Sequence, residues 1–422
     1  MDKFVIEGGR ELKGTVTVSG SKNSALPILC ASILADGPCT FHNIPDLMDI
    51  STMVEVLSVL GIKAHKPQAG TLVMDPSGIC SYEAPYDLVK SMRASILVLG
   101  PLLAKFKRAK VSLPGGCAIG VRPVDLHLKA LAKMGAHIEL SHGYIVAFTD
   151  GLKGARIIFE NTTVGGTENI MMAATLAEGT TVIEGAAREP EIPDLAEALN
   201  RMGARIEGAG TGTITIEGVR SLSGCEHSVI PDRIETGTLM VAAPITKSRL
   251  TITGVRPEHN IAVAEKLSEM GIVITEKASG IMEVDGQRDL KPVELTTAPF
   301  PGFPTDMQAQ FMALACVASG ASSITENIFE NRFMHVPELM RMGANLEEKG
   351  RTVIVRGIEQ FQGASVMATD LRASACLVLA ALNAKGLTEI RRIYHLDRGY
   401  EALDEKLTAL GARVERRKKG GL

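Results

Sequence analysis

The sequence predicts an α/β protein built from six copies of one repeat, arranged as two sets of three. Three observations support this prediction. A Leu-x-x-Met/Leu-Gly motif recurs six times, each copy carries the same order of helical and strand patterns, and the last copy lacks a strand that the N-terminal segment can supply. At 422 residues the chain is long enough for two or three hydrophobic cores.

The recurring motif ends in a glycine that we expect to close a helix. Successive glycines are 74, 68, 68, 72 and 68 residues apart, so the copies fill the chain. They are Gly61, Gly135, Gly203, Gly271, Gly343 and Gly411. Internal similarity at a fixed period indicates a fold assembled from one repeated supersecondary unit.

The third copy shows the elements that we expect in each repeat. They are a helix at 170–177, a strand at 181–184, a second helix at 192–202 and a hairpin of strands at 204–207 and 213–217. Because the first helix is rich in small apolar residues nearly all round, we expect it to be buried. The second helix carries charged residues on one side, which should face water.

The sixth copy ends before its second hairpin strand, and a strand predicted at 3–8 has no partner of its own. We therefore expect the two ends of the chain to pair. If three repeats form each domain, one domain comprises residues 22–230 and carries a cysteine loop, and the other is discontinuous, with residues 1–21 and 231–422. The chain would cross twice between them, and we expect an active site in the cleft between two such domains.

Composition argues against several classes of function. The net charge is −3, tryptophan is absent and aromatic residues make up 4%, which does not favour nucleic-acid binding. The seven cysteines are scattered and never form a CxxC pair, so we expect no zinc site, no disulfide framework and a reducing cytoplasm. The longest apolar run, 94–104, is about half the length of a membrane-spanning helix, and the charged first ten residues do not predict a signal peptide.

One cysteine is placed for chemistry. Cys117 lies among the three glycines of segment 114–120, which should leave its sulfur exposed, and Arg122 and Pro123 follow at an expected helix start. A thiol near a helix N-terminus and an arginine should have a lowered pKa, which makes it a nucleophile and a usable proton donor. We expect the other cysteines to be structural.

The repeats differ most where their helices begin, and these differences point to a ligand. If the repeats are pseudo-symmetric, the differing residues gather at one end of each domain. Helix N-termini together with several arginines and a lysine fit a strongly anionic ligand that carries phosphate and carboxylate groups. The residues are Lys22, Asn23, Asp49, Arg93, Cys117, Arg122, Thr167, Glu168, Glu189, Glu191, Arg233, Arg256, Asp306, Arg332, Arg372 and Arg398.

Several segments carry longer motifs. They are SKNS (21–24), PGGCAIG (114–120), RPVDLH (122–127), AREPEI (187–192), PDRIETGT (231–238), PTDMQAQ (304–310), ENRFMH (330–335), DLR (370–372) and DRG (397–399). Together they closely resemble the UDP-N-acetylglucosamine (UDP-GlcNAc) enolpyruvyl transferases over the whole chain. The resemblance implies two inside-out α/β barrel domains, each of three βαβαββ repeats. It also implies transfer of the enolpyruvyl group of phosphoenolpyruvate to the 3′-hydroxyl of UDP-GlcNAc with release of phosphate, the first committed step of peptidoglycan precursor synthesis.

By position, the resemblance implies a role for each motif residue. Cys117 would be the general acid toward phosphoenolpyruvate, able to form a covalent adduct with it and to react with the epoxide fosfomycin, and Asp306 would be the general base. The implied phosphate-binding cations are Lys22, Arg122 and Arg398, with Arg332 and Arg372 at the carboxylate end. The further implied substrate contacts are Asn23, Arg93, Pro123, Val124, Asp125, Leu126, Thr163, Val164, Gly165, Asp306, Ile328 and Asp370.

The resemblance implies no cofactor and no metal, since the arginines can stabilise the charges, and it implies small-molecule substrates without nucleic-acid or membrane partners. A monomer is the expectation, although the sequence leaves the oligomeric state open. One departure from the family is that segment 161–169 lacks the lysine that some members place near Asn161.

Structural alternatives accompany these roles. Residues 305–308 also fit a helix capping box around Asp306, Lys22 could be a solvated first-turn lysine, and the arginines could form surface salt bridges. We assign His127 and His395 no catalytic role. For the whole chain, the alternatives are a transferase similar to 5-enolpyruvylshikimate 3-phosphate synthase, which shares the fold, and a non-catalytic repeat scaffold.

Overall fold

The chain divides into two compact units in the computed structural model, which describes residues 2–90, 92–113 and 124–418. Within the described residues, unit 1 comprises 2–19 and 231–418, and unit 2 comprises 20–113 and 124–230. The boundaries fall after Ser19 and Ile230, whereas the sequence placed the first boundary after residue 21.

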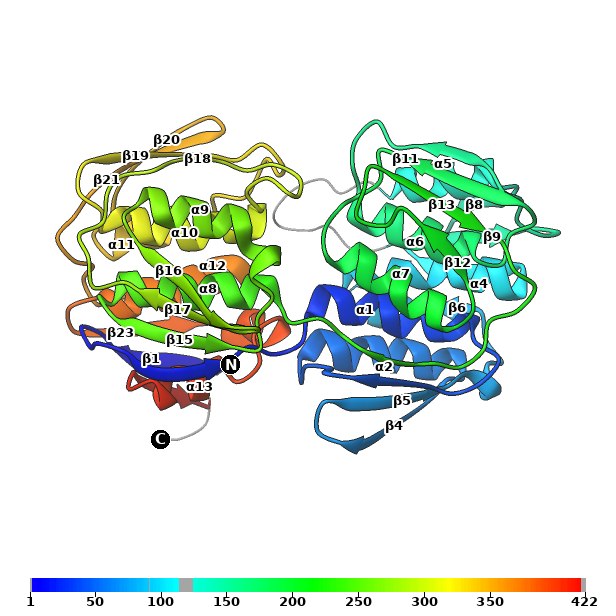
Figure 1. Cartoon of the computed structure of the whole chain (residues 1–422), viewed down its shortest axis with the longest axis horizontal. Helices are drawn as coiled ribbons and strands as arrows, with labels where there is room; N and C mark the ends of the chain where they lie inside the picture. The colour runs from blue at the N-terminus through cyan, green and yellow to red at the C-terminus, as the bar shows by residue number, and fades with distance from the viewer. Residues whose placement is uncertain (1, 91, 114–123, 419–422) are drawn as a thin grey trace. The chain divides into compact units, whose positions relative to one another are not determined.

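Unit 2 contains the first three repeats (Figure 1). The first has α1 (Lys22–Ala31), β3 (Cys39–His42), α2 (Met48–Leu60), β4 (Lys63–Gln68) and β5 (Thr71–Asp75). The second has β6 (Glu83–Ala84), α3 (Tyr86–Val89), α4 (Leu99–Phe106), β7 (Arg108–Ser112), α5 (Asp125–Lys133), β8 (His137–Ser141) and β9 (Tyr144–Phe148). The third has β10 (Arg156–Ile158), α6 (Val164–Ala174), β11 (Thr180–Glu184), α7 (Glu191–Arg201), β12 (Arg205–Glu207) and β13 (Thr213–Glu217), and β14 (Glu226–Ser228) follows.

Unit 1 begins with β1 (Lys3–Glu7) and β2 (Lys13–Thr17) and resumes after unit 2. Its first repeat has α8 (Arg233–Ile245), β15 (Arg249–Thr253), α9 (Ile261–Glu269), β16 (Val273–Ala278) and β17 (Ile281–Asp285). The next has β18 (Glu294–Thr296), α10 (Gln308–Cys316), β19 (Ala321–Thr325), α11 (Val336–Arg341), β20 (Asn345–Lys349) and β21 (Thr352–Arg356). The last has β22 (Ser365–Met367), α12 (Leu371–Asn383), β23 (Leu387–Arg391), α13 (Leu403–Ala409) and β24 (Arg413–Arg417).

The third repeat contains the elements expected from its sequence, but α6 begins at Val164 instead of residue 170 and ends at Ala174. The earlier start follows from a side-chain cap, because Thr163 Oγ1 accepts a hydrogen bond from Gly166 N at 3.2 Å. Apolar composition alone located the buried C-terminal half of this helix and missed its capped first turn.

The described residues form six four-stranded sheets, three in each unit. Each sheet has the same order, illustrated by β10-β11-β13-β12. The strand that follows the buried helix pairs in parallel with a short strand on one side and antiparallel with a long strand on the other. This repetition confirms the prediction of one recurring βαβαββ unit.

The N-terminal strand completes the last repeat. β1 lies between β23 and β24 and is antiparallel to both, with Phe4 opposite Ile390 and Arg416 (Figure 1). It occupies the place that β13 holds in the third repeat. The prediction that the N-terminal strand pairs with the sixth repeat is therefore confirmed.

Two strands each pair with a sheet of one unit, although the helix that follows them in the sequence belongs to the other unit. β2 precedes α1 along the chain but pairs in parallel with β15 of unit 1. In the same way, β14 precedes α8 but pairs in parallel with β3 of unit 2. Unit 1 is therefore discontinuous because its sheets require strands from both ends of the chain.

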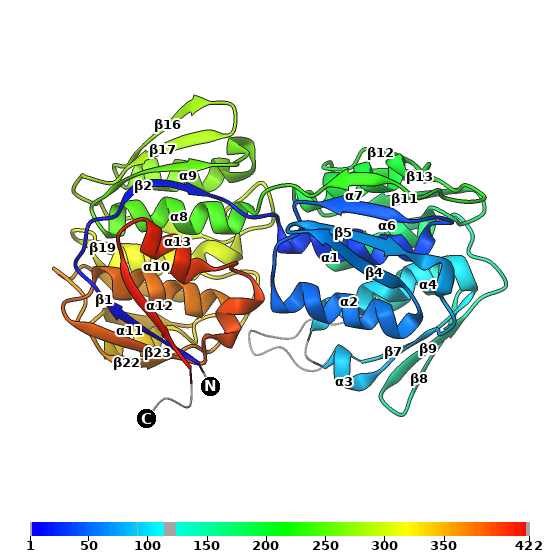
Figure 2. The same cartoon turned by 90° about the horizontal axis from the view of Figure 1, so that it is seen from below.

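The first long helix of each repeat lies inside its unit, and the sheets lie outside these helices (Figure 2). Every residue of α8 and α10 is buried, whereas α7 exposes Glu197 and Arg201. This inside-out arrangement agrees with the predicted fold class. Within the part of the chain that the structure describes, no helix combines the length and apolar character needed to cross a bilayer.

Replacing Phe4 with alanine should lower the free energy of unfolding by about 3–5 kcal/mol, because its ring is fully buried in the core of unit 1 and packs under the Arg416 guanidinium. Val5→Ala is the matched control, since Val5 lies on the other face of β1 and its truncation should cost about 1 kcal/mol or less. Urea denaturation of the whole chain measures both. Equal losses would contradict the observed alternation of β1.

Candidate functional site

Asp306 lies between two buried arginines of unit 1. It belongs to the 3-10 helix Thr305–Met307, which leads into α10. Its Oδ1 accepts a hydrogen bond from Arg332 Nη2 at 2.5 Å and its Oδ2 accepts one from Arg372 Nη2 at 3.1 Å. The arginine side chains are 6% and 7% exposed, and the Asp306 side chain is 25% exposed. The three charges therefore form a bridge at the start of two buried helices.

The bridge determines the protonation state of Asp306. Burial alone would raise the pKa of its carboxyl group, but the charges of Arg372 and Arg332 and their hydrogen bonds hold that pKa well below its usual range. Asp306 is therefore ionised and a weak base while both arginines hold it. Removing the carboxylate would leave two buried guanidinium groups without their counter-ion, which is strongly unfavourable.

The Arg332 side of the bridge is held by a second carboxylate. Arg332 Nη1 donates to Thr305 Oγ1 at 2.9 Å, and Thr305 Oγ1 donates to Glu326 Oε2 at 2.8 Å. Glu326 Oε1 accepts from the backbone N–H groups of Ile328 and Phe329 at 2.7 and 3.1 Å. Glu326, which the sequence analysis missed, thus fixes both Arg332 and the segment of the predicted contact Ile328.

The same contacts exclude a capping box at residues 305–308. The 3-10 helix has Pro304 as its N-cap, with no side-chain cap bond, and the Thr305 hydroxyl is engaged with Arg332 and Glu326. Thr305 therefore supports the charge bridge and does not cap a helix.

Arg372, the other arginine that binds Asp306, is held by buried polar side chains around the Tyr400 hydroxyl. Asp370 caps α12 by accepting from Arg372 N at 2.8 Å, which fixes the backbone from which the guanidinium extends. Arg372 Nη1 donates to Tyr400 Oη at 3.4 Å, and this hydroxyl contacts Thr238 Oγ1 at 2.8 Å and Gln310 Nε2 at 3.3 Å. Burial raises the pKa of Tyr400, so the phenol stays protonated. No site role was predicted for Tyr400, Thr238 or Gln310, although Thr238 and Gln310 end the motifs at 231–238 and 304–310.

Arg398 lies close to the N-terminal end of α12. It is partly buried at the end of the 3-10 helix Ile393–Arg398, and the next residue, Gly399, packs so closely on Leu371 that an added Cβ would lie 2.6 Å from a leucine methyl. The pKa of His395 is lowered by burial and by Arg398 and raised by Asp370, so both charged groups lie near this imidazole. Unit 1 thus gathers three predicted site arginines around two helix starts.

In unit 2, Lys22 is buried at the first position of α1. Its Nζ donates to Asp49 Oδ2 at 3.0 Å, and the two side chains are 11% and 7% exposed. A cation at a helix N-terminus is unfavourable, and Asp49 offsets that cost. The alternative that Lys22 is a solvated surface lysine is therefore wrong. Asn23, the next residue, is partly exposed at the same helix start.

The predicted sugar and nucleotide contacts of unit 2 meet at His127. Its Nδ1 lies 3.1 Å from Asn169 Nδ2 on α6, and a Cβ on Gly165 would lie 3.4 Å from its Cε1. Burial and the charge of Arg93 lower the pKa of His127 to about 4, against the opposing effect of Asp125, so the ring is neutral at pH 7. His127 therefore accepts at Nδ1 and holds α5 against α6.

This contact places the remaining residues of the predicted set. Val124 is the N-cap of α5, and Asp125 and Leu126 form its first turn. Thr163 caps α6, whose first residues are Val164 and Gly165. The sequence segments 124–126 and 163–165 are thus brought together at two helix starts, whose free backbone N–H groups favour an anion.

Three carboxylates gather beside α6. Glu168 is buried, and burial together with Glu191 and Glu189 raises its pKa well above the usual range. The loop that carries the other two acids is fixed to α6 because Ala187 N donates to Thr167 Oγ1 at 3.0 Å. Burial and the two neighbouring carboxylates therefore favour the protonated form of Glu168.

Cys117, Arg122 and Pro123 lie outside the described residues. The helix expected to start at Pro123 begins at Asp125 in the structure. In the described part of the chain, no three His, Cys, Asp or Glu side chains converge as a metal-binding group would require.

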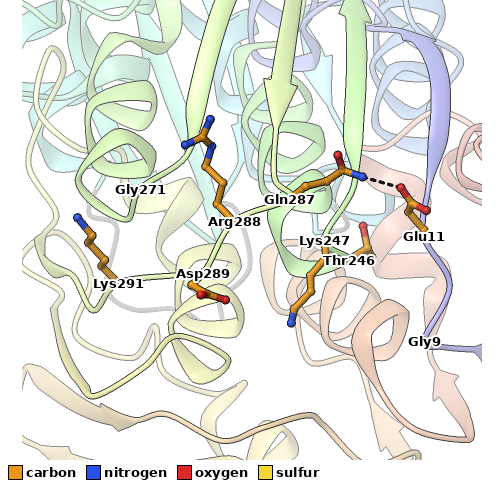
Figure 3. A pocket seen from close by; sticks show the side chains of 9 residues that line it. All are labelled: Gly9, Glu11, Thr246, Lys247, Gly271, Gln287, Arg288, Asp289 and Lys291. Atoms are coloured by element: carbon orange, nitrogen blue, oxygen red, sulfur yellow. Dashed lines mark hydrogen bonds between the residues drawn. The ribbon is translucent and has the colours of Figure 1, made fainter.

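An open hollow of about 800 Å³ lies elsewhere on unit 1 (Figure 3). It is lined by Gly9, Glu11, Thr246, Lys247, Gly271, Gln287, Arg288, Asp289 and Lys291. Its three cationic side chains point in different directions in Figure 3, and Gln287 Nε2 donates to Glu11 Oε1 at 2.9 Å. None of these residues belongs to the predicted site, and the mixed charges do not converge on one ligand.

Comparison with known proteins gives three consistent findings. A model of the family described as EPSP synthase (3-phosphoshikimate 1-carboxyvinyltransferase) matches residues 6–407. The chain is 57% identical over 417 residues to a protein of Trichlorobacter lovleyi named UDP-N-acetylglucosamine 1-carboxyvinyltransferase, with 99% of each covered. A protein of Myxococcus xanthus with the same name is 56% identical over 420 residues, covering 99% of this chain and 100% of the relative.

Solved structures agree on the fold. The enolpyruvyl transferase NikO of Streptomyces tendae has a TM-score of 0.88 at 28% identity, with 98% of each chain covered. An EPSP synthase of Acinetobacter baumannii has a TM-score of 0.77 at 22% identity, covering 99% of this chain and 100% of that one, and it shows similarity of fold alone.

His127 should make the stability of unit 2 depend on pH. Its pKa is about 4 in the folded protein, whereas an unfolded histidine takes up a proton near pH 6.5, so the unfolded state binds more protons between these values. The free energy of unfolding should therefore fall by up to about 3 kcal/mol as the pH drops through this window.

The variant His127→Asn keeps an acceptor for Asn169 but cannot titrate, so its stability should vary less between pH 6.5 and 4. Urea denaturation across this range measures the difference, and NMR titration of the ring gives its pKa directly. Identical pH dependence in the two proteins would contradict a neutral, buried His127.

Proposed function

The chain belongs to the EPSP synthase family, and from its similarity to relatives named UDP-N-acetylglucosamine 1-carboxyvinyltransferase we infer that it transfers the enolpyruvyl group of phosphoenolpyruvate to the 3′-hydroxyl of UDP-GlcNAc. Phosphate is released, and the product enters peptidoglycan precursor synthesis. The observation that carries the inference is full-length similarity to proteins named for this reaction.

The reaction is an addition followed by an elimination. A proton added to the CH₂ carbon of phosphoenolpyruvate makes the neighbouring carbon electrophilic, and the sugar oxygen attacks that carbon as its own proton passes to a base. The tetrahedral ketal then loses phosphate from the same carbon and a proton from the methyl group, which restores the double bond. The protein has to supply an acid, a base and cations that hold two anionic groups.

In the proposed mechanism, Arg332 and Arg372 bind the carboxylate of phosphoenolpyruvate and Asp306 is the base for the sugar hydroxyl. The charge bridge raises a difficulty, because Asp306 is a weak base while two guanidinium groups hold it. An incoming carboxylate competes with Asp306 for the same donors. Its binding weakens the hold on Asp306 and raises the pKa of that group, so the base becomes effective only when the second substrate is present.

The phosphate group is proposed to bind Lys22, Arg122 and Arg398. Lys22 is held by Asp49 at the N-terminus of α1, so its position is fixed before an anion arrives. In unit 2, the helix starts at Arg93, residues 124–126 and residues 163–165 provide the donors proposed for the nucleotide and sugar. Cys117 is the proposed acid that protonates the CH₂ carbon, and the same sulfur is proposed to form an adduct with that substrate.

The proposed substrates are small molecules, and the proposed chemistry uses side chains in place of a cofactor. We expect a monomer in the cytoplasm. The six described cysteines form no disulfide with one another, which is typical of a reducing compartment. A 5-enolpyruvylshikimate 3-phosphate synthase-like activity remains the enzymatic alternative, because the family model carries that name.

The purified protein should release phosphate from phosphoenolpyruvate only when UDP-GlcNAc is present, because the phosphate leaves from a ketal that the sugar hydroxyl forms. A phosphate-release assay with each substrate alone and with both measures this. Shikimate 3-phosphate as acceptor should give no release. Release with that acceptor, or none with saturating UDP-GlcNAc, would overturn the proposed function.

Cys117→Ala tests the acid within the same assay. Turnover should fall by about 10²-fold or more, and alkylation by fosfomycin should disappear. Cys80→Ala is the matched control, since Cys80 is an exposed cysteine outside the predicted site and its removal should change neither result. Fosfomycin labelling at another cysteine would refute the assignment.

The proposed release of Asp306 should appear in the pH dependence of the rate. Activity falls on the acid side as the base becomes protonated, and a base with a lower pKa loses activity at lower pH. With UDP-GlcNAc saturating, the acid limb of kcat/KM for phosphoenolpyruvate should therefore lie at lower pH than the acid limb of kcat. Coincident limbs would count against the competition described above.

A further inference from the structure

Two cysteines outside the candidate site lie on neighbouring strands where unit 2 closes on itself. Cys39 is the first residue of β3, and Cys225 directly precedes β14. These two strands pair in parallel, with Thr40 opposite Glu226, so the cysteines occupy the preceding step of the same ladder. Thr40 N donates to Cys225 O at 2.8 Å, which extends the pairing to that step.

This register brings the two sulfurs together. Residues opposite each other on parallel strands point to the same face, and neighbouring strands lie about 4.8 Å apart, within the Cα separation that a disulfide allows. The two thiols lie close enough that each shifts the pKa of the other. The backbones are also held close, because a Cβ on Gly224 would lie 2.1 Å from Pro38 O.

The two thiols differ in access and in acidity. Cys39 is fully buried, whereas Cys225 is partly exposed. The neighbouring Cys225 thiol lowers the pKa of Cys39 against the opposing effect of burial, whereas Cys39 and burial raise the pKa of Cys225 against the effect of nearby Arg201. Each thiol therefore titrates under the influence of the other, and Cys225 is the one that an external reagent can reach.

We propose that Cys39 and Cys225 are a redox-active dithiol that external low-molecular-weight disulfides, such as oxidised glutathione, convert to an intramolecular disulfide. Cys225 is the sulfur that an external reagent can reach; it attacks the external disulfide as its proton passes to the departing sulfur, which forms a mixed disulfide and releases one thiol. The sulfur of Cys39 then attacks Cys225 Sγ, which forms the Cys39–Cys225 bond and releases the second thiol. Two protons and two electrons pass to the external disulfide, so the step balances.

The bond would join the first and last strands of unit 2. β3 and β14 stand at opposite ends of this unit in the sequence, so the cross-link closes a loop that includes almost all of it. Closing a long loop restricts the unfolded chain and leaves the folded register unchanged, which stabilises the folded state. The pairing of β3 with β14 thus becomes a covalent closure of unit 2 under oxidising conditions.

Other cysteines of the chain provide internal controls. Cys316 on α10 and Cys376 on α12 also lie near each other, since Cys316 contributes to raising the pKa of Cys376, but both are fully buried. Cys80 is exposed. An external disulfide should therefore leave the two helix cysteines untouched and add glutathione to Cys80.

The test uses the whole protein in oxidised glutathione, followed by alkylation of the remaining thiols and non-reducing peptide mass spectrometry. We expect a cross-linked peptide of Cys39 and Cys225 that lacks two hydrogens and separates in dithiothreitol. The melting temperature should rise on the order of 10 °C on oxidation. If Cys80 carries glutathione while Cys39 and Cys225 both remain thiols, the proposal is wrong.

Single variants test whether Cys39 attacks the mixed disulfide at Cys225 or whether Cys225 is modified only because it is exposed. In Cys39→Ser, the mixed disulfide at Cys225 should persist because no second sulfur resolves it, and oxidation should leave the melting temperature unchanged. In Cys225→Ser, Cys39 should stay unmodified because it is buried. Glutathione on Cys39 in that variant, or an equal rise in melting temperature in oxidised Cys39→Ser, would overturn the proposed order of attack.

Discussion

Charge buried at the start of an apolar helix must be paired, and this requirement organises the candidate site in both units. In unit 1 the pairing joins Asp306 to Arg332 and Arg372, and in unit 2 it joins Lys22 to Asp49. The desolvation cost of these ions is offset before any ligand arrives. In the proposed mechanism, an anionic substrate would exchange with the Asp306 carboxylate for the two arginines, so that binding and activation of the proposed base would be one event.

A second set of buried polar groups fixes the direction of the paired charges. Glu326 holds Arg332 through Thr305, and Tyr400 holds Arg372 through its hydroxyl. These groups contribute orientation, which a long arginine side chain does not have by itself, and orientation limits how far the guanidinium can move when its partner changes. These contacts fix the orientation of the two guanidinium groups that we propose bind an anion.

The sequence predicted the repeat, the inner helices and the closing role of β1, because glycine spacing and apolar periodicity are local signals. The sequence did not reveal that β2 pairs with β15 and β14 with β3, because the apolar periodicity of a strand does not show which distant strand it pairs with. α6 begins earlier than predicted because Thr163 caps its N-terminus. Motifs pointed to Asp306 and its arginines, whereas Tyr400 and Glu326 were missed because their roles arise only from side-chain contacts formed in the folded protein.

The pairing of strands far apart in the sequence sets the order in which the chain can become structured during its synthesis. All strands of unit 2 are present once residue 228 has been made, so that unit can complete its sheets early. β1 and β2 are made first but must wait, because their partners β15, β23 and β24 follow some hundreds of residues later. The first strands to be synthesised are therefore among the last to pair. Until they pair, their backbone N–H and C=O groups can bond to strands of other chains.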